Sequence, residues 1–597
     1  MSSPESAGYW FGRGTERLDA GLFEEAETCY RKVLEIEPGH AKAKVNLGML
    51  FQRRGQEDEA ERYYRDALAT DPGLAQAWFN LGTVELDREK PAAALDHFRK
   101  AVRLEPGVAD WHSALGSAYQ RAGHPLDALA SLQIAIQRNP KLTNAHIDQG
   151  VCFLNLGDAA SAVASFRRAR ELEPSMHSAS SNFLFALNFV PDLGPDAVFQ
   201  EHVEWGRQVT RQAPKKEHGN ELNPDRKLRI GYLSPDFREH ALSFFIEPIL
   251  DRHDRSRFEA VCYSDVERED AVSRRLRGVG VLWRSTAGWG DDRLAEQVRH
   301  DGIDILVDLA GHSAGGRRML LLAAKPAPVQ VSWLGYLNTT GLATVDYRIT
   351  DWHAAPKEME RYHTERLIRM PVSQWCYRPP AGAPEVGPLP ALHNGAITFG
   401  SFHNLAKVTP QVVALWATIL RDVPDSRLIV AAHGADHLAE RLGAQFRAHG
   451  VDPGRMEGRG GMPLDAYLSL HNRVDISLDA FPYAGGTTTF HSLWMGVPVI
   501  TFGGENVVSR GGVSILSAMG LHELIGRDGR HYATIAVELA RDRERLGRMR
   551  RELRPRLARS PLMDAARYTA ALESAYREMW RACCAGRLCD APAGPIN

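Results

Sequence analysis

The chain has 597 residues, too many for a single hydrophobic core, and about two to four domains are expected. Its hydrophobic fraction of 44%, charged fraction of 24% and net charge of -2 are ordinary for globular protein and favour neither nucleic acid nor an anionic membrane as a partner. There is no apolar run near the ~18 residues of a membrane helix and no secretory signal, and seven cysteines suggest no disulfide framework. We therefore expect a cytoplasmic protein.

Three residue types recur every 34 residues in the first third of the chain. The recurring positions are Gly14, Gly48, Gly82, Gly116 and Gly150, then Ala26, Ala60, Ala94, Ala128 and Ala162, then Pro38, Pro72, Pro106, Pro140 and Pro174. The pattern predicts two helices per unit, with the Gly allowing close helix approach, the Ala at the helix crossing and the Pro ending the second helix. It resembles the tetratricopeptide repeat, and we assign residues 1–176 to five units that stack into an α superhelix with a concave groove.

One position of the first helix carries an amide side chain in two successive units. Asn46 and Asn80 hold this position and Asp148 holds it later, whereas Gly12 and Ala114 interrupt the series. Because an Asn amide can bond both the N–H and the C=O of an extended peptide, Asn46 and Asn80 are candidates for binding a protein or peptide acceptor in the groove. The alternative is that both are ordinary solvated residues. A homodimer formed through the repeats is a further expectation.

Two segments have neither the repeat pattern nor a strand pattern. Residues 177–227 begin with helical sequence and end in a charged stretch with Pro and Gly, so we interpret them as a helical linker. Residues 581–597 are interpreted as a tail, in which Cys583, Cys584 and Cys589 lack the spacing of a zinc site.

Short apolar runs typical of strands alternate with helical stretches over residues 228–385, and the alternation restarts over residues 386–580 after a Pro-rich break. This predicts two Rossmann-like α/β lobes with a ligand cleft at the carboxyl ends of their strands. Neither lobe has a G-x-G-x-x-G or a G-x-x-x-x-G-K-[ST] motif, which argues against a dinucleotide oxidoreductase and a P-loop phosphotransferase. The arrangement suits the GT-B class of glycosyltransferases, and since no D-x-D motif follows a strand in the cleft, we expect no metal.

A Gly-Gly-Thr-Thr-Thr sequence joins a strand that ends at Asp479 to a helix of the second lobe. Gly485 and Gly486 would let the backbone approach a ligand closely. Thr487 and Thr488 open the helix, where free N–H groups, hydroxyls and the helix dipole favour a phosphate. The alternative is a capped helix without a ligand.

A loop with His403, Asn404 and Lys407 follows the first strand of the second lobe. A Lys placed beside a phosphate-binding helix end can neutralise a departing diphosphate without a metal. The alternative is a surface lysine with no role in binding.

These segments resemble the family of protein O-GlcNAc transferases and its SPINDLY branch. The resemblance covers the repeats and essentially all of residues 228–580, and is carried by LRIGYLSPDFREHALSFFIEP, DILVDLAGHSAGGR, KPAPVQVSWLGYLNTTGLATVDYRITD, GSFHNLAKVTP and DISLDAFPYAGGTTTFHSLWMGVPVIT. It implies an inverting enzyme that needs no metal or cofactor and transfers one sugar, GlcNAc from UDP-GlcNAc or fucose from GDP-fucose, to Ser or Thr of proteins.

The resemblance also implies roles for individual residues. Lys407 matches the lysine that contacts the diphosphate, Thr487 and Thr488 match the phosphate-binding pair, and Asn404 stands where O-GlcNAc transferases have a Gln. His240 matches the active-site His that faces the donor sugar and the acceptor, so His240 and Lys407 are the candidate catalytic residues. His312 and Tyr336 follow further strands of the same lobe and are candidates for the acceptor side.

Four departures from the O-GlcNAc branch fall on the nucleotide side. Tyr467 replaces a His that stacks on uracil, Leu464 a Lys near the ribose, His491 an Asp that binds the ribose hydroxyls, and Gly486 a His of the phosphate loop. Tyr467 can still stack on a base. The SPINDLY branch includes enzymes that use GDP-fucose, so the donor is left open between the two nucleotide-sugars.

Two other functions remain as alternatives. The first is a catalytically weak repeat scaffold that binds protein partners, against which the presence of Lys407, Asn404 and the Thr cluster argues. The second is a glycosyltransferase that acts on a lipid or polysaccharide, against which the peptide-suited groove argues.

Overall fold

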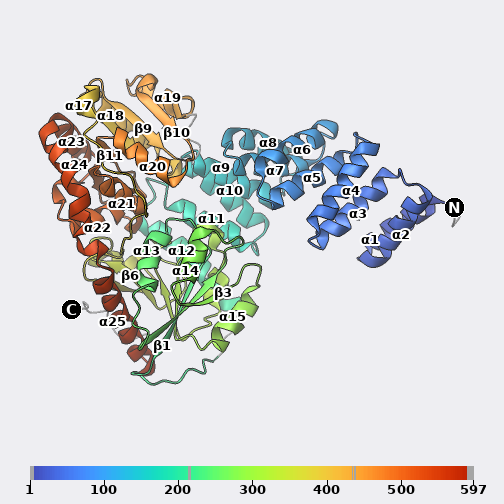
Figure 1. Cartoon of the computed structure of the whole chain (residues 1–597), viewed down its shortest axis with the longest axis horizontal. Helices are drawn as coiled ribbons and strands as arrows, with labels where there is room; N and C mark the ends of the chain where they lie inside the picture. Colours follow the sequence, from blue (N-terminus) through green and yellow to red (C-terminus); the bar gives the residue numbers. More distant parts are fainter. Residues whose placement is uncertain (1–5, 213–216, 433–434, 436–437, 588–597) are drawn as a thin grey trace. The chain divides into compact units, whose positions relative to one another are not determined.

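The computed structural model describes residues 6–212, 217–432, 435 and 438–587. The chain forms two compact units, one of Met1–Phe153 with Ala164–Glu173 and one of Leu154–Val163 with Pro174–Asn597 (Figure 1). No helix in the described part of the chain is long and apolar enough to cross a membrane. The six cysteines within it are free thiols, whereas Cys589 and the rest of the predicted tail beyond residue 587 lie outside the described residues.

The predicted repeats are confirmed as pairs of helices. In every pair the first helix has 13 residues and the second has 14. The helices are α1 (Ala7–Asp19), α2 (Phe23–Ile36), α3 (Ala41–Arg53), α4 (Glu57–Thr70), α5 (Ala75–Asp87), α6 (Pro91–Leu104), α7 (Ala109–Arg121), α8 (Pro125–Arg138), α9 (Thr143–Asn155) and α10 (Ala159–Leu172).

The recurring Gly and Ala have the packing roles that the sequence predicts. A Cβ atom at Gly48 would lie 2.5 Å from Cε1 of the Tyr64 ring, and one at Gly82 would lie 2.6 Å from Cε1 of Phe98. The recurring alanines are completely buried where the helices cross: Ala26, Ala60, Ala94, Ala128 and Ala162. The first helix of each pair therefore approaches the large side chain of the second with no room for a methyl group.

The first lobe of the second unit is a parallel sheet of seven strands in the order β3-β2-β1-β4-β5-β6-β7. Because most of its strand residues are buried on both faces, the sheet must be covered by helices on both sides. The strands are β1 (Leu228–Ser234), β2 (Phe258–Ser264), β3 (Leu282–Ser285), β4 (Ile305–Asp308), β5 (Val329–Ser332), β6 (Tyr347–Asp351) and β7 (Arg366–Met370). The helices between them are α13 (Ser243–Leu250), α14 (Ala271–Arg277), α15 (Asp291–His300) and α16 (Met319–Ala323).

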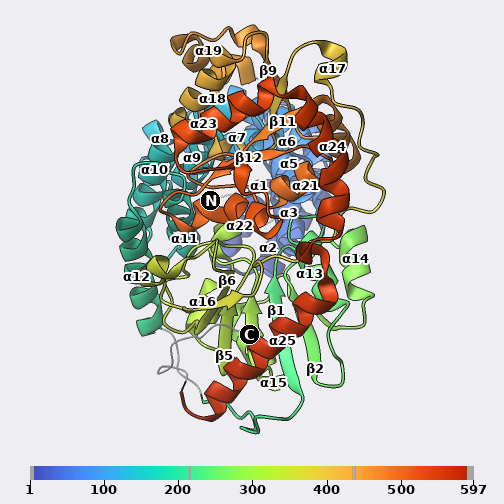
Figure 2. The same ribbon diagram turned by 90° about the vertical axis from the view of Figure 1, so that its left-hand side faces the viewer.

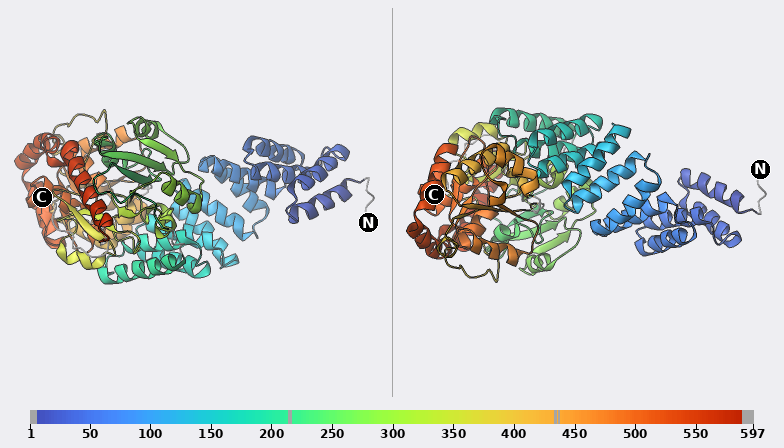
Figure 3. Two further views of the ribbon diagram at one scale, coloured as in Figure 1. Left: turned by 90° about the horizontal axis from the view of Figure 1, so that it is seen from below. Right: turned by 90° about the horizontal axis from the view of Figure 1, so that it is seen from above.

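The second lobe has a parallel sheet of six strands in the order β10-β9-β8-β11-β12-β13. The strands are β8 (Thr398–Ser401), β9 (Arg427–Ala431), β10 (Met456–Arg459), β11 (Ile476–Leu478), β12 (Val499–Phe502) and β13 (Ile525–Gly526). The helices are α17 (Ala391–Asn394), α18 (Pro410–Asp422), α19 (Leu438–Ala448), α20 (Leu464–Leu470), α21 (Thr487–Trp494), α22 (Gly511–Ala518), α23 (Gly529–Arg541) and α24 (Arg543–Ala558). Figure 3 shows the green strands of the first sheet apart from the orange strands of the second. The two predicted Rossmann-like lobes are confirmed.

The C-terminal helix α25 (Ala565–Cys584) returns to the first lobe, although its sequence follows the second (Figure 2). The Tyr568 ring stacks on Trp333 just after β5, and the Trp580 indole N–H donates to the carbonyl of Asn223 at 2.9 Å. The predicted boundary between the second lobe and the tail, at residue 580, falls inside this helix. The sequence did not indicate the packing on the first lobe, because Trp333 and Asn223 lie more than two hundred positions earlier in the chain.

The segment interpreted as a linker contains two helices of the second unit, α11 (His177–Leu187) and α12 (Pro195–Gln212). Helix α12 approaches the loop after β5 through two glycines, and a Cβ atom on Gly206 or Gly341 would overlap the backbone of the opposing segment. Gly341 also has a positive φ of 76°, a conformation that favours glycine. Both helices pack on the first lobe. No periodic sequence signal indicates these contacts, so the sequence did not predict that the segment belongs to this lobe.

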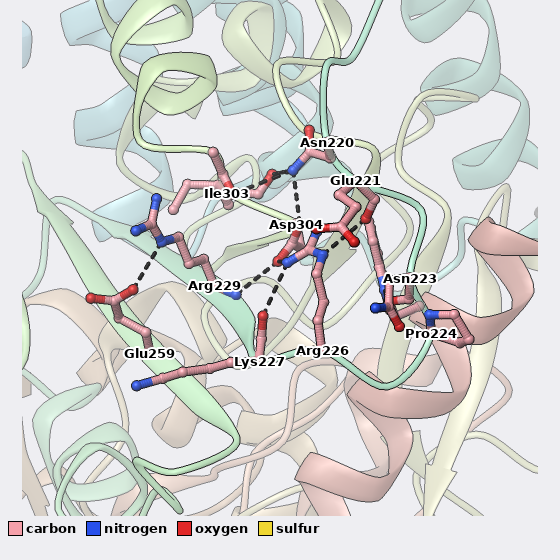
Figure 4. Close-up of polar contacts among 12 residues, drawn as sticks. Asn220, Glu221, Asn223, Pro224, Arg226, Lys227, Arg229, Glu259, Ile303 and Asp304 are labelled. Carbon is pink, nitrogen blue, oxygen red and sulfur yellow. Dashed lines mark hydrogen bonds and ion pairs between the residues drawn. The ribbon is translucent and has the colours of Figure 1, made fainter.

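Asn220 and Arg226, which shortly precede β1, bond the buried carboxylate of Asp304, as Figure 4 shows. Asp304 accepts hydrogen bonds at 2.8 Å from the Asn220 amide, from NH1 of Arg226 and from the backbone N–H of Arg229. The charged stretch that ends the predicted linker therefore includes groups that neutralise a buried charge at the start of the sheet.

We expect the substitution Gly48→Ala to destabilise the repeats by about 1–3 kcal/mol, since its methyl group would overlap the Tyr64 ring. Gly12→Ala is the matched control, because Gly12 lies within α1 with nothing within 4 Å of the added methyl group. That change should stabilise its helix by about 0.5–1 kcal/mol. Urea unfolding followed by circular dichroism measures both effects, and shifts of the same sign would contradict the packing described here.

Candidate functional site

A cavity of about 540 Å³ lies where the carboxyl ends of the two sheets face each other in the second unit. From the first lobe it is lined by residues that follow β1, β4 and β5, and from the second lobe by residues that follow β8 and β11. Six of the predicted site residues line it: His240, Asn404, Lys407, Gly486, Thr487 and Thr488. This is the position at which ligands bind in open α/β sheets.

The helix α21 begins at this cavity. Gly486 is its N-cap residue, and Thr487 and Thr488 form its first turn. A Cβ atom at Gly486 would meet only the Trp375 ring, at 3.6 Å, whereas one at Gly485 would overlap both His403 and Thr488. Gly486 thus keeps the helix end open to the cavity, and Gly485 makes room for a contact between two side chains.

Lys407 ends the short 3-10 helix η3 (Leu405–Lys407), and its ammonium group lies beside the start of α21. The Lys407 Nζ donates a hydrogen bond of 2.9 Å to the carbonyl of Ala484 and lies 4.3 Å above the Tyr483 ring. Burial lowers the pKa of Lys407 to about 8, and the negative charge of Asp479 partly opposes this shift. A cation without a carboxylate in direct contact is suited to receive an anionic ligand.

The Asn404 side chain caps the same short helix. Its Oδ1 accepts a hydrogen bond of 3.0 Å from the backbone N–H of Ala406, while the residue remains exposed at the cavity wall. The amide NH₂ group is therefore the part of Asn404 that can donate to a ligand.

His240 belongs to the opposite wall, in the loop that follows β1, and its side chain is 43% exposed. Its Nδ1 accepts a hydrogen bond of 3.3 Å from the Leu242 N–H and lies 3.7 Å from a carboxylate oxygen of Asp236. Burial lowers the pKa of His240, whereas the Asp236 charge opposes this effect. Since Nδ1 accepts, the neutral ring carries its proton on Nε2, an arrangement that favours donating a hydrogen bond to a ligand over accepting a proton from it.

His312 and Tyr336, predicted on the acceptor side, are buried below the cavity wall and do not line it. His202 Nδ1 bonds the carbonyl of Val198 at 2.7 Å, so its Nε2 must accept the hydrogen bond of 2.6 Å from the Tyr336 hydroxyl. Asn188 in turn donates to the same hydroxyl at 2.9 Å. Sequence reasoning missed Asn188, which caps α11, and His202, which lies on α12, because these helices follow no motif.

The same logic fixes the proton on His312. Its Nε2 bonds the carbonyl of Thr340 at 2.9 Å and must donate, so Nδ1 accepts from the Ser181 hydroxyl at 3.0 Å. Burial lowers the pKa of His312 to about 3 and that of His202 to about 4. Both rings are neutral at physiological pH and join α11 and α12 to the loops that line the cavity.

Tyr467, on α20, and His491, on α21, were predicted to bind the nucleoside; they lie together but do not line the cavity. Their rings are 5.7 Å apart, and the Phe244 ring of the first lobe lies 5.0 Å from His491. Burial lowers the pKa of His491 to about 3. Three buried polar atoms of this aromatic cluster have no hydrogen-bond partner: Nε2 of His491, Nε2 of His471 and the hydroxyl oxygen of Tyr377.

Asn46 and Asn80, the predicted acceptor-binding pair, belong to the first unit. Asn80 is 6% exposed, and its Oδ1 accepts from Gln76 at 2.8 Å while its Nδ2 has no partner. Asn46 is half-buried. Burial raises the pKa of Tyr30 and of Tyr64 on the preceding helices, and Asn46 opposes this rise for Tyr30.

Three more cavity residues carry chemistry that the motifs did not assign. His403 and Trp375 line the wall beside α21, and Asp236 lies next to His240. The sequence signal for His403 was present, since it shares a loop with Lys407, but a single His in a loop has many structural uses. Among the described residues, no three His, Cys, Asp or Glu side chains are grouped so that they could hold a metal ion.

We expect Tyr336→Phe to lower the free energy of unfolding of the second unit by about 1–3 kcal/mol, because His202 Nε2 would lose its donor in a buried site. Tyr347→Phe is a matched control in the same lobe, since that buried hydroxyl has one long contact of 3.4 Å with Arg366. Urea unfolding followed by tryptophan fluorescence compares the two. A stable Tyr336→Phe protein with weakened acceptor binding would show instead that the hydroxyl acts in the cavity.

The chain has similarity to known proteins along most of its length. Residues 203–376 and 389–572 match glycosyl transferase family 41, and residues 11–75, 45–109 and 113–177 match the tetratricopeptide repeat. The solved structure of a Lys-to-Met mutant of the O-GlcNAc transferase of Thermobaculum terrenum is 34% identical, with a TM-score of 0.75, and the match covers 92% of this chain and 98% of that one.

The SPINDLY proteins of Petunia hybrida and Arabidopsis thaliana are 42% and 41% identical to this chain over 69% and 70% of its length. Each is named a probable UDP-N-acetylglucosamine–peptide N-acetylglucosaminyltransferase. The matches cover 45% and 46% of those proteins, so the chain spans about half the length of the curated relatives. The resemblance inferred from the sequence motifs is confirmed, and the chain belongs to glycosyl transferase family 41.

Proposed function

We propose that this chain is a protein O-glycosyltransferase that transfers a single sugar from a nucleoside-diphosphate donor to Ser or Thr hydroxyls. One observation carries the proposal: the Lys407 ammonium and the N-terminus of α21 lie together on one wall of a cavity that has His240 on the other wall. The names of the relatives, which describe transfer of N-acetylglucosamine to peptide, support a protein acceptor.

The proposed reaction is a single displacement with inversion at the anomeric carbon. The acceptor oxygen forms a bond to this carbon as the bond to the β-phosphate oxygen breaks. The proton of the acceptor hydroxyl is lost to the solvent, and negative charge develops on the leaving diphosphate. Lys407, the Asn404 amide and the free N–H groups of α21 stabilise that charge, and no metal is required because the cation and the helix dipole supply the neutralisation. His240, with its proton on Nε2, positions the donor sugar or acceptor by donating a hydrogen bond.

For the acceptor, we propose that the repeats present a protein segment through Asn46 and Asn80. The unpartnered Nδ2 of Asn80 supports this role, whereas its burial at 6% exposure requires local rearrangement before it can bond a peptide. A lipid or polysaccharide acceptor receives no comparable support from the repeat unit.

Lys407→Met should lower kcat/KM by about two to three powers of ten, which corresponds to about 2–4 kcal/mol of transition-state stabilisation. Its thermal unfolding should be nearly unchanged, because a half-buried cation without a carboxylate in direct contact adds little stability. Release of nucleoside diphosphate with a peptide mixture as acceptor is the measurement. A variant with more than about a tenth of the wild-type activity would refute the assignment.

The pH dependence tests the charge of Lys407 separately. Lys407 is protonated below its pKa of about 8 and loses its charge above it, so kcat/KM for the donor should fall as the pH rises through about 8. Arg remains protonated throughout this range, so Lys407→Arg should remove this basic limb while keeping part of the activity. An identical basic limb in the two proteins would assign the titration to another group.

We further propose that the donor nucleoside is read near Tyr467 and His491, with UDP-GlcNAc and GDP-fucose as the two candidates. The aromatic surfaces and the unpartnered polar atoms beside α21 support a base-binding role. Contacts to the diphosphate are common to both donors, so discrimination between uracil and guanine must come from the base and the sugar.

One nucleotide should therefore bind at least about tenfold more tightly than the other, because the wrong base leaves buried polar groups unpaired. Competition of UDP and GDP against a labelled donor measures this preference. Tyr467→Ala should reduce it, while Tyr467→Phe, which keeps the stacking ring, should retain most of it. Equal inhibition by UDP and GDP would show that the base is not read.

A further inference from the structure

A chain of three polar side chains joins the end of β11 to the cavity, and no part of the proposed reaction uses it. His403 Nε2 lies 3.1 Å from Oδ1 of Asp479, and His403 Nδ1 lies 3.0 Å from the Thr488 hydroxyl. His403 and Asp479 are almost completely buried, while Thr488 lines the cavity at the start of α21. Gly485 is required at this place, since a Cβ there would overlap both His403 and Thr488.

Asp479 can only accept hydrogen bonds here. Its carboxylate already accepts from the N–H groups of Ala480 and Gly485, at 2.9 and 2.8 Å, and from the Thr501 hydroxyl at 2.7 Å. Burial by itself would raise the pKa of Asp479, but His403 and these donors together hold that pKa below its ordinary value. Nε2 of His403 lies 3.1 Å from this carboxylate without the alignment of a hydrogen bond, and the negative charge favours a proton on that nitrogen.

The protonation state of His403 decides, through Nδ1, how the Thr488 hydroxyl is oriented at the cavity. In the neutral ring with its proton on Nε2, Nδ1 can only accept a hydrogen bond. The Thr488 hydroxyl therefore donates its single hydrogen to His403. Its oxygen then presents only lone pairs to the cavity, which repel an anionic ligand. When Nδ1 also carries a proton, it donates to the Thr488 oxygen, and the hydroxyl proton is free to turn toward a phosphate.

We propose that His403 is a positioning residue that takes up a proton when the diphosphate binds and thereby turns the Thr488 hydroxyl toward the phosphate. The proton comes from the solvent and adds to Nδ1, and no other bond forms or breaks. This inference rests on the proposed donor site.

Among the described residues, two charged groups meet at this place. Asp479, at the end of β11, favours a proton on the His403 ring, and the Lys407 cation on the neighbouring η3 competes with the ring for the same carboxylate. An anion at the cavity wall would offset the Lys407 charge. Binding of the diphosphate and protonation of His403 therefore favour each other.

The test is isothermal titration of the full chain with UDP and with GDP in two buffers of different ionisation enthalpy at one pH, which counts the protons taken up. His403→Asn is the test variant, because an amide can donate to Asp479 but cannot gain a proton. His393→Asn, at an exposed position of α17, controls for the loss of a histidine elsewhere. Thermal unfolding of each variant shows that it is folded.

We expect the wild-type chain and His393→Asn to take up more protons on nucleotide binding than His403→Asn does. His403→Asn should also bind the nucleotide about tenfold more weakly, since it loses a charge-assisted hydrogen bond relayed through Thr488. In a Thr488→Val background, the same His403→Asn substitution should have no further effect on affinity or proton uptake, because the relay is already broken. Uridine and guanosine, which lack phosphates, should not distinguish His403→Asn from wild type.

The outcomes separate this inference from the proposed function. If UDP or GDP binds with equal affinity and equal proton uptake to wild type and His403→Asn, the role of His403 is wrong and the donor site stands. A loss that persists in the Thr488→Val background would make His403 a structural residue and overturn the relay. If neither nucleotide binds the wild-type chain, the donor site is wrong and the inference falls with it.

Discussion

The geometry of the site depends on the buried carboxylate of Asp479 at the end of β11. Its oxygens accept hydrogen bonds from two backbone N–H groups and a hydroxyl, so a charge that burial disfavours remains stable. These bonds fix the loop that leads into α21. The same loop supplies the carbonyl of Ala484 that Lys407 binds and the space that Gly485 leaves for His403. The hydrogen-bonded Asp479 carboxylate thus fixes the positions of the α21 N-terminus, Lys407 and His403 relative to one another.

The cavity wall of the second lobe holds positive potential without a matching anion in contact. Burial lowers the pKa of Lys407 because its neighbours are a carbonyl and an aromatic face, with Asp479 acting only at a distance. A diphosphate would supply the missing negative charge and would keep the lysine protonated to a higher pH. In the proposed donor site this wall binds the phosphates, whereas the choice of nucleoside belongs to the separate aromatic cluster around Tyr467 and His491.

The first lobe is completed by segments from outside its own stretch of sequence. Helices α11 and α12 bond the loops after β4 and β5 through neutral histidines, and α25 packs beside β5 and β7. Buried hydrogen bonds to α11 and α12 therefore hold the loops that line the cavity, and in each bond the donor and the acceptor are defined. His312 and Tyr336 belong to this bracing, which explains why two polar residues beside a cavity are closed to solvent.

The sequence by itself determined the repeats, the two lobes and the cavity residues His240, Asn404, Lys407, Thr487 and Thr488, because each depends on local periodicity or on a short motif at a strand end. Tertiary structure alone decided which strand-end residues face the cavity. His312 and Tyr336 are hydrogen-bonded to residues of α11 and α12 instead of lining the cavity. No local sequence pattern indicates that these helices cover the lobe. It also decided that His403 lies between Asp479 and Thr488, since that contact joins residues more than seventy positions apart. The spacing of residues along the chain predicts the secondary structure of a segment. The hydrogen-bond partner of a buried polar atom is fixed only when segments distant in sequence pack together.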